Sequence, residues 1–393
     1  LTHYAVLNAT CETRLTGTGT GVGVYLRSYY DNSVDYRHNG EAYLSGFRIS
    51  VFGRGIQMED YKDYDHPSCS AGKLRLSGSE VTANSLSGVA ALNLYHSPDI
   101  EVTGSDIYGN GKELELSLGS GNFASTVINA TGNWWGTADP VTIAGNITDN
   151  GDNGALPQVR FLPLLEGSIK GAPAILTKTN YLQGPLEQDK TLTAAGGPYT
   201  VVSPVYIGGD RSLRIEAGTE LRFVPGVFLQ VDGQLTVQGT EGLPVVFTSN
   251  ATNPKAGDWG GIRFTGTSDA QESVLEWVKI RYATVGLSLD GNWAPNPLQV
   301  KHVEIADSSD KGLYIKDSSP SVDGLTVKDF VNYGIHVTGG STAAVLKNVT
   351  VSQGGTRYAS GTGMFMENSA RVSLSGGSSF TGISTGIFLT HYA

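Results

Sequence analysis

Short segments that begin with glycine recur at a nearly constant spacing in the last third of the chain. After the glycine, each segment alternates side chains between two faces, as a half-buried β-strand requires. The segments are GIRF from Gly261, GLSL from Gly286, GLYI from Gly312, GIHV from Gly334, GMFM from Gly363 and GIFL from Gly386. The steps between them are 25, 26, 22, 29 and 23 residues. A fixed return period of this kind indicates a repeat architecture.

A second series of strands lies between these segments. Its members are LEWVKI ending at Ile280, VKHVEI ending at Ile305, VDGLTV ending at Val327 and LKNVTV ending at Val351. Two interleaved series with one period predict an all-β parallel solenoid, in which each coil of about 22–29 residues adds one strand to each long sheet. A β-sandwich would show frequent turns without a fixed return period. The first third continues the ladder with GVYL from Gly23, GIQM from Gly55, ALNL from Ala91 and LELSL from Leu114.

The pentapeptide LTHYA occurs at residues 1–5 and again at residues 389–393. On the resulting period of 388 residues, the step from Gly386 to the next Gly23 is 25 residues, which is one ordinary rung. We therefore expect the sequence to be one period of a tandem array that was cut within a solenoid. Copies of the chain, joined head to tail or covalently, are the partners that this pattern predicts.

The strand pattern changes twice in the middle of the chain. Residues 1–166 are expected to form the C-terminal half of a solenoid module, with two long loop insertions. Residues 167–195 lose the rungs and are expected to be a linker, and residues 196–393 are expected to form the N-terminal half of the next module.

Several blocks resemble right-handed parallel β-helix repeat proteins of bacterial and archaeal cell surfaces, within the pectate-lyase-like β-helix superfamily. LRIEAGTELRF, GQLTVQGTEGLPVVFTS and GDWGGIRF resemble the opening coils, and NWWGTADP followed by DNGDNG is similar to the closing coil. The resemblance covers most of the chain outside the linker and implies a right-handed β-helix. It says little about function, since the superfamily includes surface proteins, polysaccharide-degrading enzymes and tailspikes.

Composition narrows the class of function. Charged residues make up 16% of the chain and the net charge is −10, which argues against nucleic-acid binding. No run of about 18 apolar residues is present that could span a membrane as a helix. We expect an extracellular or cell-surface protein.

The function predicted from the repeats is structural and non-enzymatic: the repeat unit of a filament, sheath, surface layer or stalk. The first alternative is a β-helix that binds or degrades polysaccharide, with a surface glycan as ligand, and the second is an adhesin module. An enzyme of this fold needs clustered carboxylates with a basic residue on an outer face. The outward carboxylates Glu115 and Glu304 are isolated in the sequence, and no column of aspartates recurs.

Two stretches carry candidate site residues. Asp149 and Asp152, in TDNGDNG, are candidate calcium ligands, with an ordinary turn as the alternative and no other cofactor expected. Two tyrosine-rich insertions after consecutive strands are candidate interaction loops, with solvated loops as the alternative. Their residues are Tyr29, Tyr30, Tyr36, Asp60, Tyr61, Asp63, Tyr64, Asp65 and His66.

The last predictions from the sequence concern covalent modification. Cys11 and Cys69 form a disulfide or remain two isolated thiols. Five Asn-x-Ser/Thr sequons would be glycosylated if the protein is exported by a host that glycosylates. They begin at Asn8, Asn129, Asn146, Asn250 and Asn348.

Overall fold

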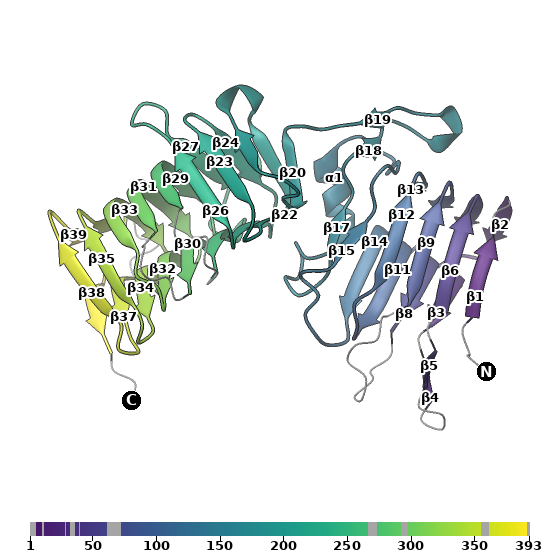
Figure 1. Cartoon of the computed structure of the whole chain (residues 1–393), viewed down its shortest axis with the longest axis horizontal. Helices are drawn as coiled ribbons and strands as arrows, with labels where there is room; N and C mark the ends of the chain where they lie inside the picture. Colours follow the sequence, from purple (N-terminus) through teal and green to yellow (C-terminus); the bar gives the residue numbers. More distant parts are fainter. Residues whose placement is uncertain are drawn as a thin grey trace. The chain divides into compact units, whose positions relative to one another are not determined.

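The chain forms two β-helical units, Leu1–Thr179 and Asn180–Ala393 (Figure 1). The structure, a computed structural model, describes residues 5–9, 12–27, 29–31, 36–38, 40–60, 72–265, 273–291, 298–354 and 361–390. For residues 5, 29–31, 36–38 and 40 only the backbone is described.

Three parallel sheets of six, four and five strands build the first unit, and each of its first four coils contributes one strand to each sheet. The first sheet contains β1 (Ala5–Ala9), β6 (Gly40–Ser45), β9 (Lys73–Ser77), β12 (Asp99–Thr103), β15 (Val127–Asn129) and β17 (Gln158–Arg160). The second contains β2 (Thr13–Thr16), β7 (Phe47–Ser50), β10 (Glu80–Thr82) and β13 (Asp106–Tyr108). The third contains β3 (Val22–Arg27), β8 (Arg54–Glu59), β11 (Ser87–Leu94), β14 (Lys112–Leu118) and β16 (Ile147–Thr148).

The second unit continues the same plan over more coils. Its opening strands are β20 (Tyr181–Pro185), β21 (Lys190–Leu192) and β22 (Tyr199–Ile207). One ladder then runs through β25 (Phe228–Val231), β28 (Gly261–Phe264), β30 (Val285–Asp290), β32 (Lys311–Lys316), β34 (Tyr333–Thr338), β37 (Thr362–Met366) and β40 (Thr385–Leu389). The other two ladders share the remaining strands. They begin with β23 (Ser212–Glu216), β24 (Glu220–Phe223), β26 (Gln234–Gln238) and β27 (Val245–Ser249), and continue through the long strands β29 (Val274–Arg281), β31 (Gln299–Ser308) and β33 (Ser321–Phe330). They end with β35 (Ala343–Lys347), β36 (Thr350–Ser352), β38 (Arg371–Ser375) and β39 (Ser379–Thr381).

These ladders confirm the predicted right-handed parallel β-helix. The glycine-led segments lie opposite one another in register: Leu287 pairs with Leu313, and Leu313 pairs with Ile335. All three side chains are fully buried, so the inward positions of successive coils form one continuous apolar core.

The recurring glycine has a steric cause. A Cβ added at Gly312 would lie 2.7 Å from the carbonyl oxygen of Gly334 in the next coil, and one added at Gly334 would lie 2.7 Å from that of Gly363. Real Cβ atoms do not approach an oxygen so closely. These coils can therefore stack as they do only with glycine at this corner.

Buried polar ladders hold one edge of the first unit together. The Ser79 backbone N–H donates to Ser105 Oγ at 3.2 Å, and the Ser105 N–H donates to Asn133 Oδ1 at 2.9 Å. Asn133 also donates to the carbonyl oxygens of Val102 and Ala130. Asn133 belongs to the NWWG block, so this part of the expected closing coil acts through hydrogen bonds inside the solenoid.

The segment expected as a linker is divided between the two units. The hydroxyl of Ser168 and the N–H of Ile169 both donate to the buried carboxylate of Asp106, which ties residues 168–169 to the first unit. From Tyr181 onward, β20 and β21 pair with β22 and β23 and form the first coil of the second unit. The predicted linker over 167–195 is therefore too long, because its second half, from Tyr181 onward, belongs to the second solenoid unit.

Short elements complete the two units. They are the antiparallel hairpin of β4 (Tyr29–Asp31) and β5 (Tyr36–His38), the antiparallel pair β18 (Leu164–Leu165) and β19 (Ile175–Leu176), α1 (Pro140–Gly145), and the 3-10 turns Ile169–Gly171 and Ala194–Gly196. Asp139 caps α1, because its side chain accepts the N–H groups of Val141 and Thr142.

Candidate functional site

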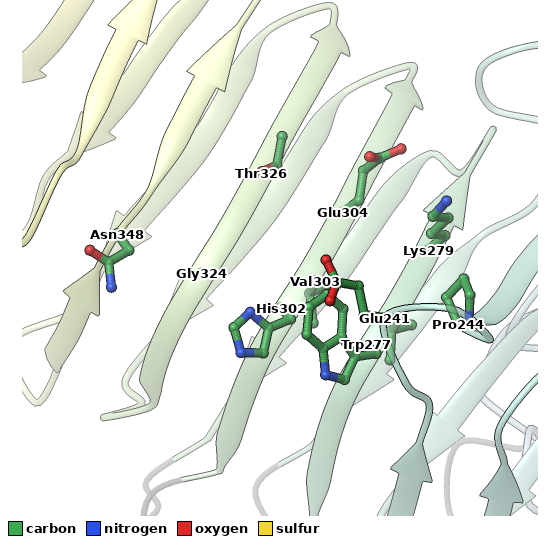
Figure 2. A pocket seen from close by; sticks show the side chains of 11 residues that line it. Glu241, Pro244, Trp277, Lys279, His302, Val303, Glu304, Gly324, Thr326 and Asn348 are labelled. Carbon is green, nitrogen blue, oxygen red and sulfur yellow. The ribbon is translucent and has the colours of Figure 1, made fainter.

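A groove of about 420 Å³ lies on the outer face of the second unit, across consecutive coils (Figure 2). The turn before β27 supplies Glu241 and Pro244, and the strands β29, β31 and β33 supply most of the rest. The lining residues are Glu241, Pro244, Trp277, Val278, Lys279, His302, Val303, Glu304, Gly324, Thr326 and Asn348.

Four of these residues occupy the same corner of successive coils. Trp277, His302, Gly324 and Asn348 have φ angles of 52°, 53°, 78° and 53°. The strand register on either side of each residue makes them equivalent. Glycine and asparagine adopt this left-handed conformation readily, whereas bulky side chains rarely do. Residues held in such conformations concentrate at binding and active sites, which directs attention to Trp277 and His302.

The two aromatic rings form a face-to-face stack, called the aromatic platform below. The rings of Trp277 and His302 stack with centroids 4.1 Å apart and an interplanar angle of 13°. The next rung is Gly324, where an added Cβ would lie 3.1 Å from His302 Nδ1. Because Gly324 carries no side chain, the stack of rings stops at His302 and the groove continues over bare backbone toward Asn348 (Figure 2).

Polar groups line the platform. Glu304 accepts hydrogen bonds from Arg281 Nη2 and Lys328 Nζ, each at 3.3 Å. Burial raises the pKa of Glu304, but the nearby cations lower it by a larger amount. The pKa of Glu304 therefore lies below the ordinary value for glutamate. Asn348 Nδ2 donates to Asp323 Oδ1 at 2.7 Å. Glu304 is therefore held ionised between two cations, which does not suit a general acid.

The candidate calcium residues lie in a tight turn. Asp149 is buried, and its carboxylate accepts the N–H groups of Gly151 and Val159 at 2.8 and 3.1 Å. Asp152 Oδ2 accepts the N–H of Asp149 at 3.1 Å. Within the described ranges, no group of three or more His, Cys, Asp or Glu side chains is arranged to hold a metal ion. Calcium at this turn stays a prediction.

The candidate interaction loops are described only in part. Tyr29, Tyr30 and Tyr36 lie in the β4–β5 hairpin, for which the backbone alone is described. Asp60 does not project from a loop: it is buried, and its carboxylate accepts the N–H groups of Tyr95 and His96 and contacts His96 Nδ1 at 3.0 Å. The remaining loop residues, Tyr61, Asp63, Tyr64, Asp65 and His66, lie outside the described residues, as do Cys11 and Cys69.

The five sequons differ in accessibility. Asn8 and Asn348 are exposed, whereas Asn129, Asn146 and Asn250 are half-buried. Asn129 also donates to Glu101 and accepts from Thr131. Glycosylation at any of them stays a prediction, and Asn348 lies at the edge of the groove.

Trp277 and His302 are not among the site residues predicted from the sequence, although the sequence contains a signal for them. The second strand series contains LEWVKI and VKHVEI, in which Trp277 and His302 occupy the same place one rung apart. An aromatic pair at the coil period, outside the inward apolar positions, is the pattern that would have found the groove.

Fold and groove together define the class: a right-handed parallel β-helix protein with an aromatic groove on an outer face. Residues 184–286 match the family model described as pectate-lyase like beta helix domain. Among curated proteins, the chain is similar to Protein bark beetle of Drosophila melanogaster, with 29% identity over 136 residues. That match covers 32% of this chain and 4% of the relative, so the chain spans a small part of the relative's length.

Proposed function

We propose that this chain is a non-enzymatic, extracellular β-helix protein that binds a glycan in the Trp277–His302 groove. The observation that carries the proposal is the pair of parallel rings, stacked face to face at 4.1 Å beside an open slot at Gly324. The apolar face of a sugar ring can pack on the free face of such a stack, while hydroxyl groups around the rim of the sugar hydrogen-bond to polar side chains. Lys279, Glu304 and Thr326 stand in position to form that rim.

The fold and the charges support this reading. A pectate-lyase-like β-helix domain suggests a surface or carbohydrate-related protein. Among the described residues, no helix has the length and apolar character needed to cross a membrane. The pairing of Glu304 with Arg281 and Lys328 supports binding over acid–base chemistry.

The test is a glycan array followed by calorimetry with the whole chain. Trp277→Ala is expected to weaken binding by about tenfold, because one aromatic stacking contact contributes ~1–1.5 kcal/mol. Tyr314→Ala is the matched control, because Tyr314 is an aromatic residue on β32, outside the groove. Equal affinities of the wild type and the Trp277 variant would refute the groove as the binding site.

A second measurement addresses catalysis. Incubation of the protein with the polysaccharide that binds best is expected to leave chain length unchanged. Shortening of the polysaccharide that Glu304→Gln abolishes would overturn the non-enzymatic assignment and leave glycan binding standing.

A structural role is the second candidate function: the repeat unit of a filament, sheath, surface layer or stalk. It is supported by the uninterrupted strand ladders of the second unit. An adhesin role for the tyrosine-rich insertions is a further candidate. Deletion of residues 61–71, which spares the buried Asp60, should abolish partner binding without unfolding the first unit.

A further inference from the structure

Asn348 combines a place in the wall of the Trp277–His302 groove with a complete glycosylation sequon. Asn348, Val349 and Thr350 form Asn-x-Thr, the acceptor pattern for N-linked glycans in exported proteins. The side chain of Asn348 is exposed, whereas Val349 is fully buried and anchors the corner from inside. Of the five sequon asparagines, Asn348 is the one that lines the groove.

Asn348 stands between two glycines at equivalent corners of neighbouring coils. The register of β33, β35 and β38 places Gly324 one coil before Asn348 and Gly376 one coil after it. A Cβ added at Gly376 would lie 2.3 Å from Asn348 Oδ1, so the amide of Asn348 uses the space that a side chain at Gly376 would fill. On the other side, Gly324 leaves an open slot between Asn348 and His302 (Figure 2).

Hydrogen bonds turn the amide nitrogen of Asn348 toward this slot. Asn348 Nδ2 donates to Asp323 Oδ1 at 2.7 Å, and Asp323 directly precedes Gly324 in the chain. Asn348 Oδ1 accepts the N–H of Gly377 at 3.3 Å, from the coil on the other side. Exchange of the amide nitrogen and oxygen would break both bonds, because an ionised carboxylate only accepts and a backbone N–H only donates. The nitrogen that would carry a glycan therefore faces the coil that contains the slot.

The slot has the dimensions of one sugar ring. Adjacent coils lie about 4.8 Å apart, so His302 and Asn348, which are separated by the coil of Gly324, lie about 10 Å apart along the helix axis. One face of the His302 ring stacks on Trp277 at 4.1 Å, and the opposite face is turned toward Gly324.

A sugar joined to Asn348 Nδ2 and placed over Gly324 would contact this free face of His302 at about 4 Å, the ordinary packing distance. The same position leaves its hydroxyl groups beside Thr326, which lines the groove on the strand that follows Gly324. Sequon, amide orientation and slot therefore lead to one location for an attached sugar.

We infer that Asn348 carries an N-linked glycan whose first sugar packs in the slot at Gly324, against the free face of His302. The inference rests on the proposed glycan-binding function and names an occupant of the groove, the chain's own glycan. In the transfer, Asn348 Nδ2 bonds to C1 of a sugar on a lipid-linked oligosaccharide donor, the bond from C1 to the pyrophosphate of the donor breaks, and Nδ2 gives up one proton. The second N–H remains to donate to Asp323. The attached sugar closes the groove to external glycans.

Expression of the whole chain in two hosts tests the inference. One is a bacterial host without N-glycosylation machinery, and the other secretes the chain behind an added leader and glycosylates Asn-x-Thr. Enzymatic release of glycans in heavy-oxygen water, followed by peptide mass spectrometry, reports the occupancy of Asn348. Thr350→Ala is the matched control, because it removes the sequon, keeps the Asn348 side chain and changes a half-buried residue that does not line the groove. An unmodified Asn348 in the wild type from the second host overturns the inference.

Calorimetry with the glycan that binds best measures whether the attached sugar closes the groove. The wild type and Thr350→Ala from the bacterial host should bind this glycan equally. From the glycosylating host, the wild type should bind at least about tenfold more weakly than Thr350→Ala, because its stacking contact is already occupied. Equal affinities of these last two proteins, with Asn348 occupied, would mean that the glycan projects into solvent and would overturn the inference.

Modification of His302 by diethyl pyrocarbonate locates the attached sugar without an external ligand, since His302 is exposed in the chain itself. In the glycosylating host, the wild type should lose most of the His302 modification that Thr350→Ala shows, and equal reaction would overturn the inference. If the bacterial proteins bind no glycan, the proposed glycan-binding function fails, and protection of His302 still decides the inference. If they bind glycan while Asn348 stays unmodified in the second host, the inference fails and the proposed function stands.

Discussion

Glu113 provides a test of how the buried interior of the first unit responds to pH. Glu113 lies opposite Gly88 in the next coil, at the corner where other coils carry glycine, and is 4% exposed. Burial raises its pKa to about 7, although hydrogen bonds from Asn110 lower it in part. Asn110 Nδ2 donates to Glu113 Oε2 at 2.7 Å.

The sign and size of the effect follow from this shift. A carboxyl group whose folded pKa lies above its unfolded value favours folding when it is protonated. Its contribution is fully present below the unfolded pKa of 4.5 and is lost as the pH rises through about 7. A difference of about 2.5 pKa units corresponds to about 3 kcal/mol, or about 300-fold in the equilibrium for local opening.

Glu113→Gln removes the titration while keeping an oxygen that can accept from Asn110. Hydrogen exchange of peptides from β11 and β14 reports local opening, and comparing both proteins at the same pH cancels the intrinsic exchange rate. At pH 8 the variant should be better protected by up to about 300-fold, and at pH 4 the two should be alike.

Glu115→Gln is the matched control on the same strand. Glu115 is half-buried and forms an ion pair with Arg54 at 3.2 Å, so its replacement should give no gain at pH 8. The reasoning about Glu113 fails if Glu113→Gln changes protection by the same factor at pH 4 and pH 8.

Three further substitutions test the packing. Asn133→Ala should destabilise the first unit by about 3 kcal/mol in urea unfolding, because the carbonyls of Val102 and Ala130 lose their donor; a loss below about 1 kcal/mol would show that the ladder contributes little. Trp259→Ala should cost the second unit about 3–5 kcal/mol, since this fully buried ring stacks on Phe223 at 4.0 Å, and an unchanged thermal midpoint would contradict this. Gly334→Ala should lower the yield of folded protein or its melting temperature, whereas Gly242→Ala, with open space around it, should leave both unchanged.

Much of the fold was predictable because its signals are local and repeat along the chain. Inward positions must be apolar in every coil, and the corner at Gly312 and Gly334 admits no side chain, so both constraints appear at the coil period. The end of the first unit was harder to locate. Residues 181–192 carry no recognisable rung, yet they pair with β22 and β23, whose ladder supplies the partners for a short and polar segment.

The candidate site residues, unlike the fold, depended mainly on the tertiary structure. Asp60 looks like a loop residue in the sequence but is buried, because two backbone N–H groups thirty-five and thirty-six positions away converge on its carboxylate. Trp277 and His302 lie one rung apart in the sequence, but the slot beside them exists only because Gly324 falls at the same corner of the next coil.

The sequence by itself determined that the chain coils into a parallel β-solenoid, since burial and steric exclusion recur from coil to coil and leave a periodic record. Only the tertiary structure decided which outward side chains meet. Neighbours on an outer face come from different coils and face solvent, where many residue types are tolerated, so no single stretch of sequence records their contact.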